Sequence, residues 1–374
     1  MAPAPGVPDP LDELPIHQVP TSLRYVATSD RNAYDRCVLH AFSPDGTTYL
    51  MGGFGVYPNL GVIDGYVTVR QGDRQVAVQA SGAIGRDRSA QVVGPLRLEV
   101  LQPLQRLRLV GEDAGYGIAC DLVYEAAFPA REEPRHLTYT SERVSNDACR
   151  FVQVGRWSGT LEVEGVTLDV AGWSGDRDRS WGIRRLGEPE PAGKPPADPI
   201  SGFWWVWAPL RFEDYAVVVI AGEDPDGTRN LHEAVRVFSP ESGRAPEQLG
   251  WAEFDIAYRS GTRHPERATI HLSGRRGKPF DIEIETLSAI ALNVGCGYGS
   301  DPEWSHGVWK GAQWARGVTY DLTDPAIIAQ SSLTLLDHVA RATTEDGEGL
   351  GIFEHGVLGR HDPTGFADWS AVAP

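Results

Sequence analysis

The run GDRDRSWGIR, residues 175–184, concentrates side chains that can exchange protons. In an extended strand, residues 177, 179 and 181 share one face and residues 176, 178 and 180 share the other, because side chains alternate. A carboxyl group such as that of Asp178, buried beside Trp181, has its pKa raised by the loss of solvation. It could then protonate an alkene or a tertiary alcohol as a general acid. The neighbouring Arg177 and Arg179 oppose this by favouring the charged form.

A structural role is the alternative for the same run. Alternating arginines and aspartates are able to form an ion-pair network that fixes a linker between two halves of the chain. The catalytic hypothesis assigns Asp178 as the acid and Arg177, Arg179 and Trp181 as substrate-binding neighbours. The two hypotheses differ in whether Asp178 faces a cavity.

The segment GFWWVWAPL, residues 202–210, places two tryptophans on one face of a predicted strand. Trp205 and Trp207 are two residues apart and share that face, whereas Trp204 points to the other layer. The pair is predicted to wall an apolar pocket, and aromatic faces stabilise carbocations by cation–π attraction. Packing in the core of a barrel is the alternative.

A weak internal repeat directs attention to His306 and Trp309. Residues 155–165 read GRWSGTLEVEG and residues 307–317 read GVWKGAQWARG, so three glycines and one tryptophan align at an offset of 152. His306 stands where the first copy has Val154, and a polar residue at a position that is apolar in its counterpart is a mild indication of function. A hydrogen-bonded structural histidine is the alternative. Trp309 is a further candidate for substrate binding.

Glu354 and His355 in GIFEHG are candidates for proton transfer and for substrate binding, respectively. Neighbours on a strand point to opposite faces, so the two do not form a dyad with each other. The alternative for Glu354 is an ion pair with an arginine such as Arg184 or Arg341.

Several motifs of nucleophile, nucleotide and metal chemistry are missing from the sequence. There is no G-x-S-x-G elbow, no G-x-G-x-x-G turn between a strand and a helix, and no phosphate-binding loop. No H-E-x-x-H or paired Cys/His cluster indicates zinc. We therefore expect no cofactor and no metal site.

Short apolar alternations between Gly, Asp and Pro turns recur from about residue 49 onward. Examples are YVTVR (66–70), RQVAVQA (74–80), DYAVVVIAGE (214–223) and FDIEIETLSAIALN (280–293). Period-two patterning rich in Val, Ile, Thr and aromatic residues is the strand signal, and many strands spaced by turns favour a sandwich or barrel. The fold class is therefore predicted to be all-β with little helix.

One segment departs from the strand pattern. TDPAIIAQSS (323–332) offers an aspartate cap and a proline at the first helical position, which predicts a short helix. The following residues are predicted to form a hairpin around Asp346-Gly347. A helix through 324–341 is the competing interpretation.

The chain is long enough for two domains of ordinary size. LGEPEPAGKPPADP (186–199) carries five prolines near the middle of the chain and is predicted to be a linker or an exposed loop. We expect a flexible N-terminal arm over residues 1–20, then domains over 21–190 and 191–374.

The charge and cysteine content limit partners and location. The formal net charge is −17, and an acidic surface repels nucleic acid and anionic membranes. The four cysteines lack metal-ligand or redox spacing and are expected to be reduced thiols. The N-terminus lacks the features of a signal peptide, and no apolar run approaches the roughly 18 residues that span a bilayer. A cytoplasmic protein is expected, and homo-oligomerisation is compatible with the sequence.

GRWSGTLEVEG, GDRDRSWGIR, the strand GFWWVWAPL and the ending GIFEHGVLGR together resemble the bacterial two-domain calycin group. This group includes carotenoid 1,2-hydratase, AttH-like proteins and the similar lipocalin-like Diels–Alderases. An actinobacterial set of uncharacterised proteins is the narrower resemblance, which covers roughly residues 25–365. It implies two lipocalin-like barrels with a ligand space in or between them. It also implies hydration, dehydration or cyclisation of terpenoid- or polyketide-like molecules without a cofactor.

These observations support three hypotheses. The first is a cofactor-independent lyase or isomerase in which a buried acid, Asp178 by preference, exchanges a proton with a hydrophobic terpenoid-, steroid- or polyketide-like small molecule. The second is a non-catalytic carrier of such a molecule, which requires no buried ionisable group in its cavity. The third is a structural protein with filled barrels, in which no cavity exceeds roughly 300 Å³. The fold by itself does not decide among them.

Overall fold

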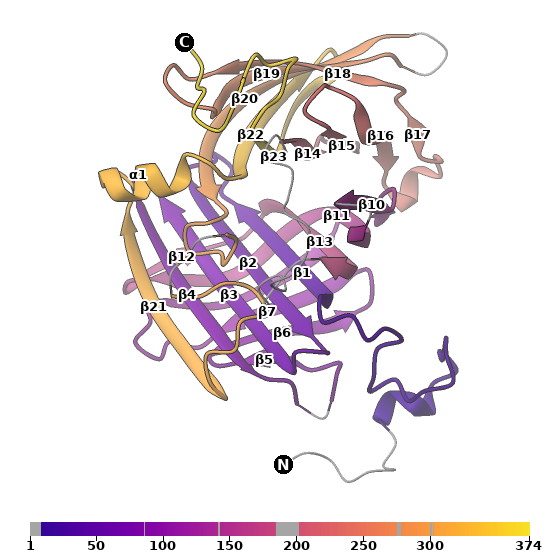
Figure 1. Cartoon of the computed structure of the whole chain (residues 1–374), viewed down its shortest axis with the longest axis vertical. Coiled ribbons are helices and arrows are strands. Elements are labelled where there is room, and N and C mark those ends of the chain that lie inside the picture. Colours follow the sequence, from indigo (N-terminus) through magenta and orange to yellow (C-terminus); the bar gives the residue numbers. More distant parts are fainter. Residues whose placement is uncertain are drawn as a thin grey trace.

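The structure is a computed structural model that describes residues 9–85, 87–140, 143–184, 202–274, 278–299, 301 and 303–374. Two antiparallel sheets contain almost all of the regular structure, one above the other in Figure 1. The first sheet curls into a nearly closed barrel and the second forms a half-barrel, so the prediction of an all-β fold in tandem barrels is confirmed.

The first sheet has 14 strands in the order β21-β4-β3-β2-β1-β13-β11-β8-β7-β6-β5, with β9, β10 and β12 paired to β11. Their bounds are Ala33–Phe42 (β1), Thr48–Tyr57 (β2), Val62–Gln71 (β3), Arg74–Ala83 (β4), Gln91–Val93 (β5), Leu96–Gln102 (β6), Arg106–Gly111 (β7), Ile118–Ala126 (β8), Arg131–Glu132 (β9), His136–Thr140 (β10), Arg143–Val163 (β11), Val166–Asp169 (β12), Trp173–Arg184 (β13) and Gln313–Asp321 (β21).

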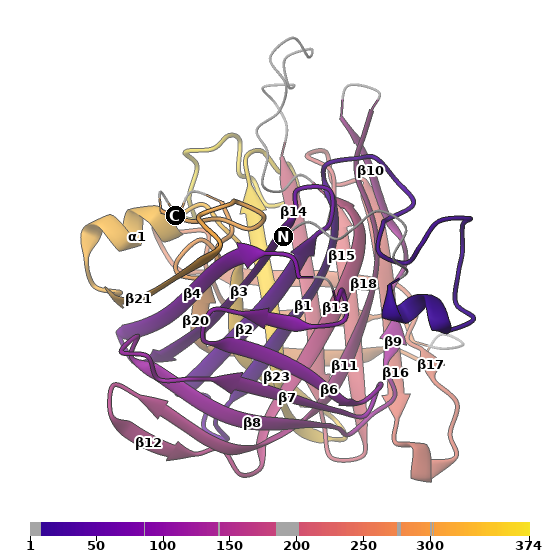
Figure 2. The ribbon, with the colours of Figure 1, turned by 90° about the horizontal axis from the view of Figure 1, so that it is seen from below.

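The second sheet has nine strands in the order β17-β16-β15-β14-β23-β22-β20-β19-β18. Their bounds are Phe203–Arg211 (β14), Tyr215–Glu223 (β15), Arg229–Phe238 (β16), Glu247–Gln248 (β17), Ala252–Tyr258 (β18), Pro265–Leu272 (β19), Phe280–Ala291 (β20), Leu336–Thr344 (β22) and Gly347–Leu358 (β23). Seen from below, strands β2–β4 cross in front of this sheet (Figure 2).

Within the described residues, helical structure is confined to short elements. Two 3-10 helices span Pro10–Glu13 (η1) and Pro240–Ser242 (η2), and the α-helix α1 spans Pro325–Ser331. The predicted short helix is confirmed, because Asp324 caps it by accepting a hydrogen bond from the Ala326 N–H. The predicted hairpin between β22 and β23 is confirmed as well. No helix of the described residues is long and apolar enough to cross a membrane.

Strand β21 connects the two halves of the chain in an unexpected way. It follows most of the second sheet in sequence but pairs with β4 at the edge of the first sheet. The ion pair between Arg316 and Asp301, at 3.0 Å, and a hydrogen bond from Arg316 to Gln79 help to hold it there. The predicted domain boundary at 190/191 falls in residues 185–201, outside the described residues, so it stays a prediction.

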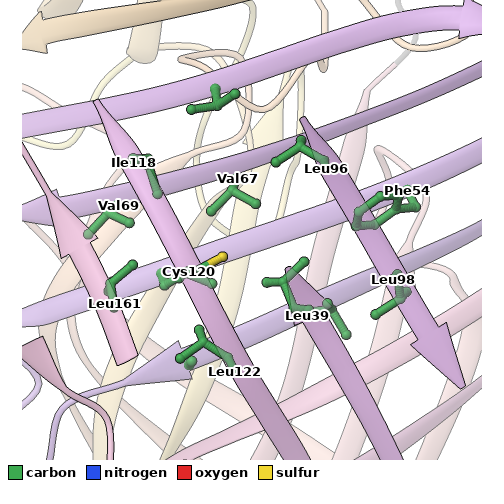
Figure 3. Packing of buried hydrophobic residues seen from close by; sticks show 14 of the residues in the cluster. Leu39, Phe54, Val67, Val69, Leu96, Leu98, Ile118, Cys120, Leu122 and Leu161 are labelled. Atoms are coloured by element: carbon green, nitrogen blue, oxygen red, sulfur yellow. The ribbon is translucent and has the colours of Figure 1, made fainter. Parts of the chain in front are cut away.

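Side-chain alternation divides the interior into separate cores. The first fills the barrel formed by the first sheet, where Leu39, Phe54, Val67 and Leu122 point toward one another (Figure 3). The second fills the concave side of the second sheet, around residues such as Phe353. A third core joins the two sheets and draws residues from both. The interiors of both halves are therefore occupied by side chains, and space for a ligand must lie elsewhere.

The sequence repeat does not correspond to a structural repeat. Trp157 lies in β11, is 1% exposed and packs in the first core. Trp309 lies in a loop before β21 and is 52% exposed. The expectation that the two segments are equivalent is wrong, because Trp157 belongs to a central strand and Trp309 to a loop.

Gly175 in β13 leaves no room for a side chain. A Cβ atom there would lie 1.9 Å from the His40 carbonyl oxygen and 2.6 Å from the indole nitrogen of Trp157. We expect Gly175→Ala to lower the free energy of unfolding by about 1–3 kcal/mol, measured by urea denaturation. Gly85 is the control, since nothing lies within 4 Å of its Cβ position. Equal effects of Gly175→Ala and Gly85→Ala would contradict the steric argument.

Candidate functional site

A cavity of about 1030 Å³ lies between the two sheets. Its walls come mainly from β1, β10, β11 and β13 of the first sheet and from β14 and the β15–β16 turn region of the second, with single residues from β22 and β23. Alternate side chains of a strand reach it: β1 supplies Tyr34, Arg36, Val38 and His40, and β14 supplies Trp205 and Trp207. The cavity therefore lies between the halves and outside the filled barrel interior.

Asp178 on β13 lines this cavity, as the catalytic hypothesis requires. Its Oδ1 atom accepts a hydrogen bond from the Val38 N–H at 3.2 Å. Burial raises the pKa of Asp178, although the nearby Arg150 and His40 oppose the shift. Asp176 and Ser180 share its face of β13, and Ser180 also lines the cavity.

Glu354 on β23 is the second carboxyl group on the cavity wall. It accepts a hydrogen bond from the Trp205 indole N–H and lies opposite Asp337, its cross-strand neighbour on β22. Burial and the adjacent Asp337 raise the pKa of Glu354 well above its usual range. Two buried carboxyl groups side by side cannot both ionise readily, so the protonated form of Glu354 is favoured.

His40 connects the carboxyl groups of the two sheets. Its Nδ1 lies 2.7 Å from Oδ1 of Asp176, and its Nε2 lies 3.1 Å from Oδ2 of Asp337. Burial alone would lower the pKa of His40, but the two carboxylates outweigh burial and raise it well above the usual range. Since both ring nitrogens face acceptors, His40 donates from both as an imidazolium.

The side chains Asp176, His40, Asp337 and Glu354 thus form a continuous array that ends at the cavity, which we call the carboxyl–histidine array. His40, Asp337 and Glu354 line the cavity, and the buried Asp176 lies behind its wall. Oδ1 of Asp337 has no donor among the hydrogen bonds of the described residues. This oxygen is therefore available to accept a hydrogen bond from the protonated carboxyl group of Glu354.

Trp207 and Arg150 hold a separate buried carboxyl group, that of Glu133. The Trp207 indole N–H donates to Oε1 of Glu133 at 2.7 Å, and Nε of Arg150 lies 2.7 Å from Oε2. The Arg150 guanidinium also lies 5.2 Å from the centroid of the Trp205 ring. The tryptophans predicted to wall the cavity therefore do so, but a protein cation already occupies a cation–π position at Trp205.

Several sequence candidates lie away from the cavity. Trp181 is 40% exposed and packs against Phe151, because it lies on the face of β13 opposite Asp178. Arg177 points to the opposite face of β13 and donates to Oε1 of Gln153. Arg179, on the same face, forms an ion pair with Asp35 at 2.8 Å. The exposed Trp309 does not line the cavity either.

The two candidate histidines are both buried but differ in their surroundings. His355 faces the second core, where Nδ1 lies 2.7 Å from the Trp205 carbonyl oxygen and Nε2 lies 3.0 Å from the Tyr258 hydroxyl. Burial lowers the pKa of His355 to about 4. His306 lies behind the cavity wall, with Nε2 3.1 Å from Nη2 of Arg36. Neither histidine lines the cavity.

Sequence reasoning missed the residues that connect the two halves, namely His40, Asp337, Arg36 and Arg150. A signal was present for three of them. His40 and Arg36 interrupt the apolar strand ending CVLHAF, and Asp337 interrupts LTLLDHV. A charged side chain on an otherwise buried strand requires a partner, yet the sequence does not say which strand supplies it.

Among the parts of the chain that the structure describes, no three His, Cys, Asp or Glu side chains are grouped so that they could hold a metal ion. The chemistry that the described cavity offers is that of its own carboxyl, imidazole and guanidinium groups.

Comparisons with known proteins place the chain by sequence and by fold. The sequence model of one family, described as a family of unknown function (DUF8625), matches residues 9–367. No curated protein matches the sequence. An AttH-like protein of Nitrosomonas europaea (NE1406) is similar in structure, with a TM-score of 0.53, 13% identity, and coverage of 94% of this chain and 99% of that one.

Two further structures are similar at lower scores. Kievitone hydratase of Nectria haematococca has a TM-score of 0.48 and 13% identity, over 91% of this chain and 90% of that one. CghA, determined with Sch210972, has a TM-score of 0.48 and 10% identity, over 89% of each chain. The predicted resemblance to this structural group is confirmed as a likeness of fold.

Proposed function

Because the chain belongs to this family of unknown function, its activity has to be inferred from the site, and we propose a cofactor-independent lyase or isomerase. It would act by general acid–base chemistry on a hydrophobic terpenoid-, steroid- or polyketide-like small molecule. The observation that carries the proposal is the carboxyl group of Glu354 on the wall of a large cavity. Burial and the neighbouring Asp337 favour the protonated form of this group.

The two cavity carboxyl groups have different surroundings, which suits them to different roles. Glu354 faces another carboxyl group and is the proton donor. Burial raises the pKa of Asp178, but the positive charges of Arg150 and His40 favour its ionised form, and we assign it as the proton acceptor.

In a hydration, the Glu354 proton is transferred to one alkene carbon and leaves a cation at the other. Water adds to that cation and loses its proton to Asp178. In a dehydration, Glu354 protonates the hydroxyl, water leaves and Asp178 removes a proton from the adjacent carbon; in an isomerisation or cyclisation, Asp178 removes a proton from carbon without the addition of water. In each route, Glu354 gives one proton to the substrate, and Asp178 takes one proton from the substrate or from the added water.

The surroundings of Glu354 support its role as a positioned donor. The Trp205 N–H donates to one carboxyl oxygen, and Asp337 lies beside the group on the next strand. Trp205 is itself stacked on Phe203 and His136, with ring centroids 5.7 Å apart in each case. A carboxyl group held in one orientation loses little entropy when it transfers a proton.

A carrier of the same small molecule is the second candidate. Carriage alone needs no buried ionisable group in the cavity, and Asp178, Asp337 and Glu354 line this one. The cavity is also far larger than the roughly 300 Å³ below which a purely structural role is favoured. These observations support catalysis over both alternatives.

Isotope exchange with solvent tests the proposal. The compound that co-purifies with the protein is identified by native mass spectrometry and incubated with the protein in D₂O or in ¹⁸O-labelled water. Uptake of deuterium at carbon, or of ¹⁸O, is expected with the wild type. Binding of the compound without any uptake of solvent isotope would identify a carrier and overturn the proposal.

Asp178→Asn is expected to reduce this exchange by about 10²-fold while ligand affinity and folding are kept. The amide retains the shape of the side chain but cannot accept the proton. Asp214→Asn, in an exposed turn between β14 and β15, is the control and should exchange at the wild-type rate. Normal turnover by Asp178→Asn would refute its role as base, and unfolding of this variant would support the ion-pair network instead.

A further inference from the structure

We propose that Arg36 and Tyr298 form a subsite for one anionic oxygen group, a carboxylate or an enolate, at one end of the cavity. The ligand of this protein is then a hydrophobic acid. This inference rests on the proposed function and narrows the class of its substrate. It is carried by a buried cation on the cavity wall that forms no ion pair within 4.0 Å with a carboxylate of the described residues.

Arg36 on β1 is only 3% exposed, yet it lines the cavity. Among the described residues, its side chain makes one hydrogen bond, from Nη2 to Nε2 of His306, and its Nε has no acceptor. A guanidinium remains charged in proteins, and a buried charge without a counter-ion is costly. An anionic ligand group would supply the missing acceptor and the missing charge.

The partner that Arg36 does have is neutral. Burial lowers the pKa of His306 well below its usual range, and Arg36 itself adds to the shift. His306 therefore accepts the guanidinium hydrogen bond with an unprotonated Nε2 and contributes no charge. His306 therefore lies behind the cavity wall and positions the guanidinium group of Arg36.

No ion pair within 4.0 Å joins Arg36 to a carboxylate of the described residues. Asp64 is fully buried on β3, where it accepts from the Gly307 N–H at 2.7 Å; its charge acts on Arg36, but burial raises its pKa to about 7. The positive charge of Arg36 favours the ionised form of Asp178, but no ion pair within 4.0 Å joins the two side chains among the described residues. By contrast, Arg150 has Glu133 as a close partner.

Tyr298 completes the subsite. It lines the cavity beside Arg36, whose guanidinium carbon lies 4.9 Å from the centroid of the Tyr298 ring. Burial raises the pKa of the Tyr298 hydroxyl, so this group keeps its proton and can donate it to an anion. A guanidinium and a phenol next to each other offer an anionic oxygen two charge-assisted hydrogen bonds.

Paired fluorescent probes test the subsite without knowledge of the substrate. The probes are 11-(dansylamino)undecanoic acid and its methyl ester, which differ only in the carboxylate charge. Fluorescence titration of the full chain should show that the wild type binds the acid about tenfold or more tightly than the ester, because hydrogen bonds to charged groups are the stronger ones. Equal affinity for the two probes, or binding of neither, would overturn the proposal.

Variants assign the preference to the named residues. Arg36→Gln should abolish the preference for the acid and leave binding of the ester unchanged, and Tyr298→Phe should reduce the preference in part. Arg267→Gln, at an exposed position on β19, is the control and should retain it. If Arg36→Gln does not fold, Tyr298→Phe decides, and an unchanged preference in that variant refutes the assignment.

The same titration separates this inference from the proposed reaction. Glu354→Gln should bind the acid with the wild-type preference even though its turnover is lost. A protein that exchanges solvent isotope but does not prefer the acid would refute the subsite alone. One that prefers the acid but exchanges no isotope would refute the reaction alone.

Discussion

Glu354→Gln is expected to reduce turnover by about 10²–10⁴-fold while the fold and the affinity for ligand are kept. Glutamine has the shape of a protonated glutamate, so its amide oxygen can still accept from the Trp205 N–H and its amide nitrogen can donate to Asp337. What it lacks is a transferable proton. Solvent-isotope uptake measures the loss, and a thermal or urea unfolding curve checks the fold.

The pH dependence of the wild type gives a second measure of the same group. Turnover requires the protonated form of Glu354, so it should fall as the pH rises through the raised pKa of this group. Glu348→Gln, at an exposed position on the same strand, is the matched control. Wild-type turnover in Glu354→Gln would exclude Glu354 as the donor.

His40→Asn is expected to lower the free energy of unfolding by about 3–5 kcal/mol, the cost of leaving buried carboxylates without their counter-ion. Asp176 is 1% exposed and Asp337 is 0% exposed, and His40 lies between them. Because these two residues come from different sheets, the loss should also weaken the contact between the two halves of the protein.

His271 offers an unusually close control. It too lies between two aspartates, with Nδ1 3.1 Å from Asp281 and Nε2 3.1 Å from Asp255, but all three side chains are exposed to solvent. Exposed ion pairs contribute at most about 1 kcal/mol. His271→Asn should therefore change the stability far less than His40→Asn, and equal losses would contradict the role of burial.

The stability of the wild type should also depend on pH in a defined direction. The pKa of His40 is raised in the folded state, so its contribution is fully present below the unfolded value of about 6.5 and is lost as the pH rises through the folded pKa. The free energy of unfolding should therefore decline above about pH 6.5, and less steeply in His40→Asn than in the wild type. Parallel declines in the two proteins would show that His40 does not carry the effect.

The period-two alternation of β-strands made much of the local arrangement predictable. It placed Trp205 and Trp207 opposite Trp204, Glu354 opposite His355, and Asp178 opposite Arg177, and the structure has each pair on opposite faces. This works because the direction of a side chain in a strand depends only on whether its position is odd or even. The capped helix α1 and the hairpin after it follow from equally local rules.

Which faces meet was decided by the tertiary structure alone. His40 and Asp337 are separated by 297 residues, and Arg36 and His306 by 270, so no local period relates them. The repeat suggested that Trp157 and Trp309 are equivalent, yet one is buried in a barrel and the other is exposed. The alternating sequence thus determined an all-β chain and the faces of its strands, whereas the packing of one sheet against the other created the cavity, because burial depends on neighbours that are distant along the chain.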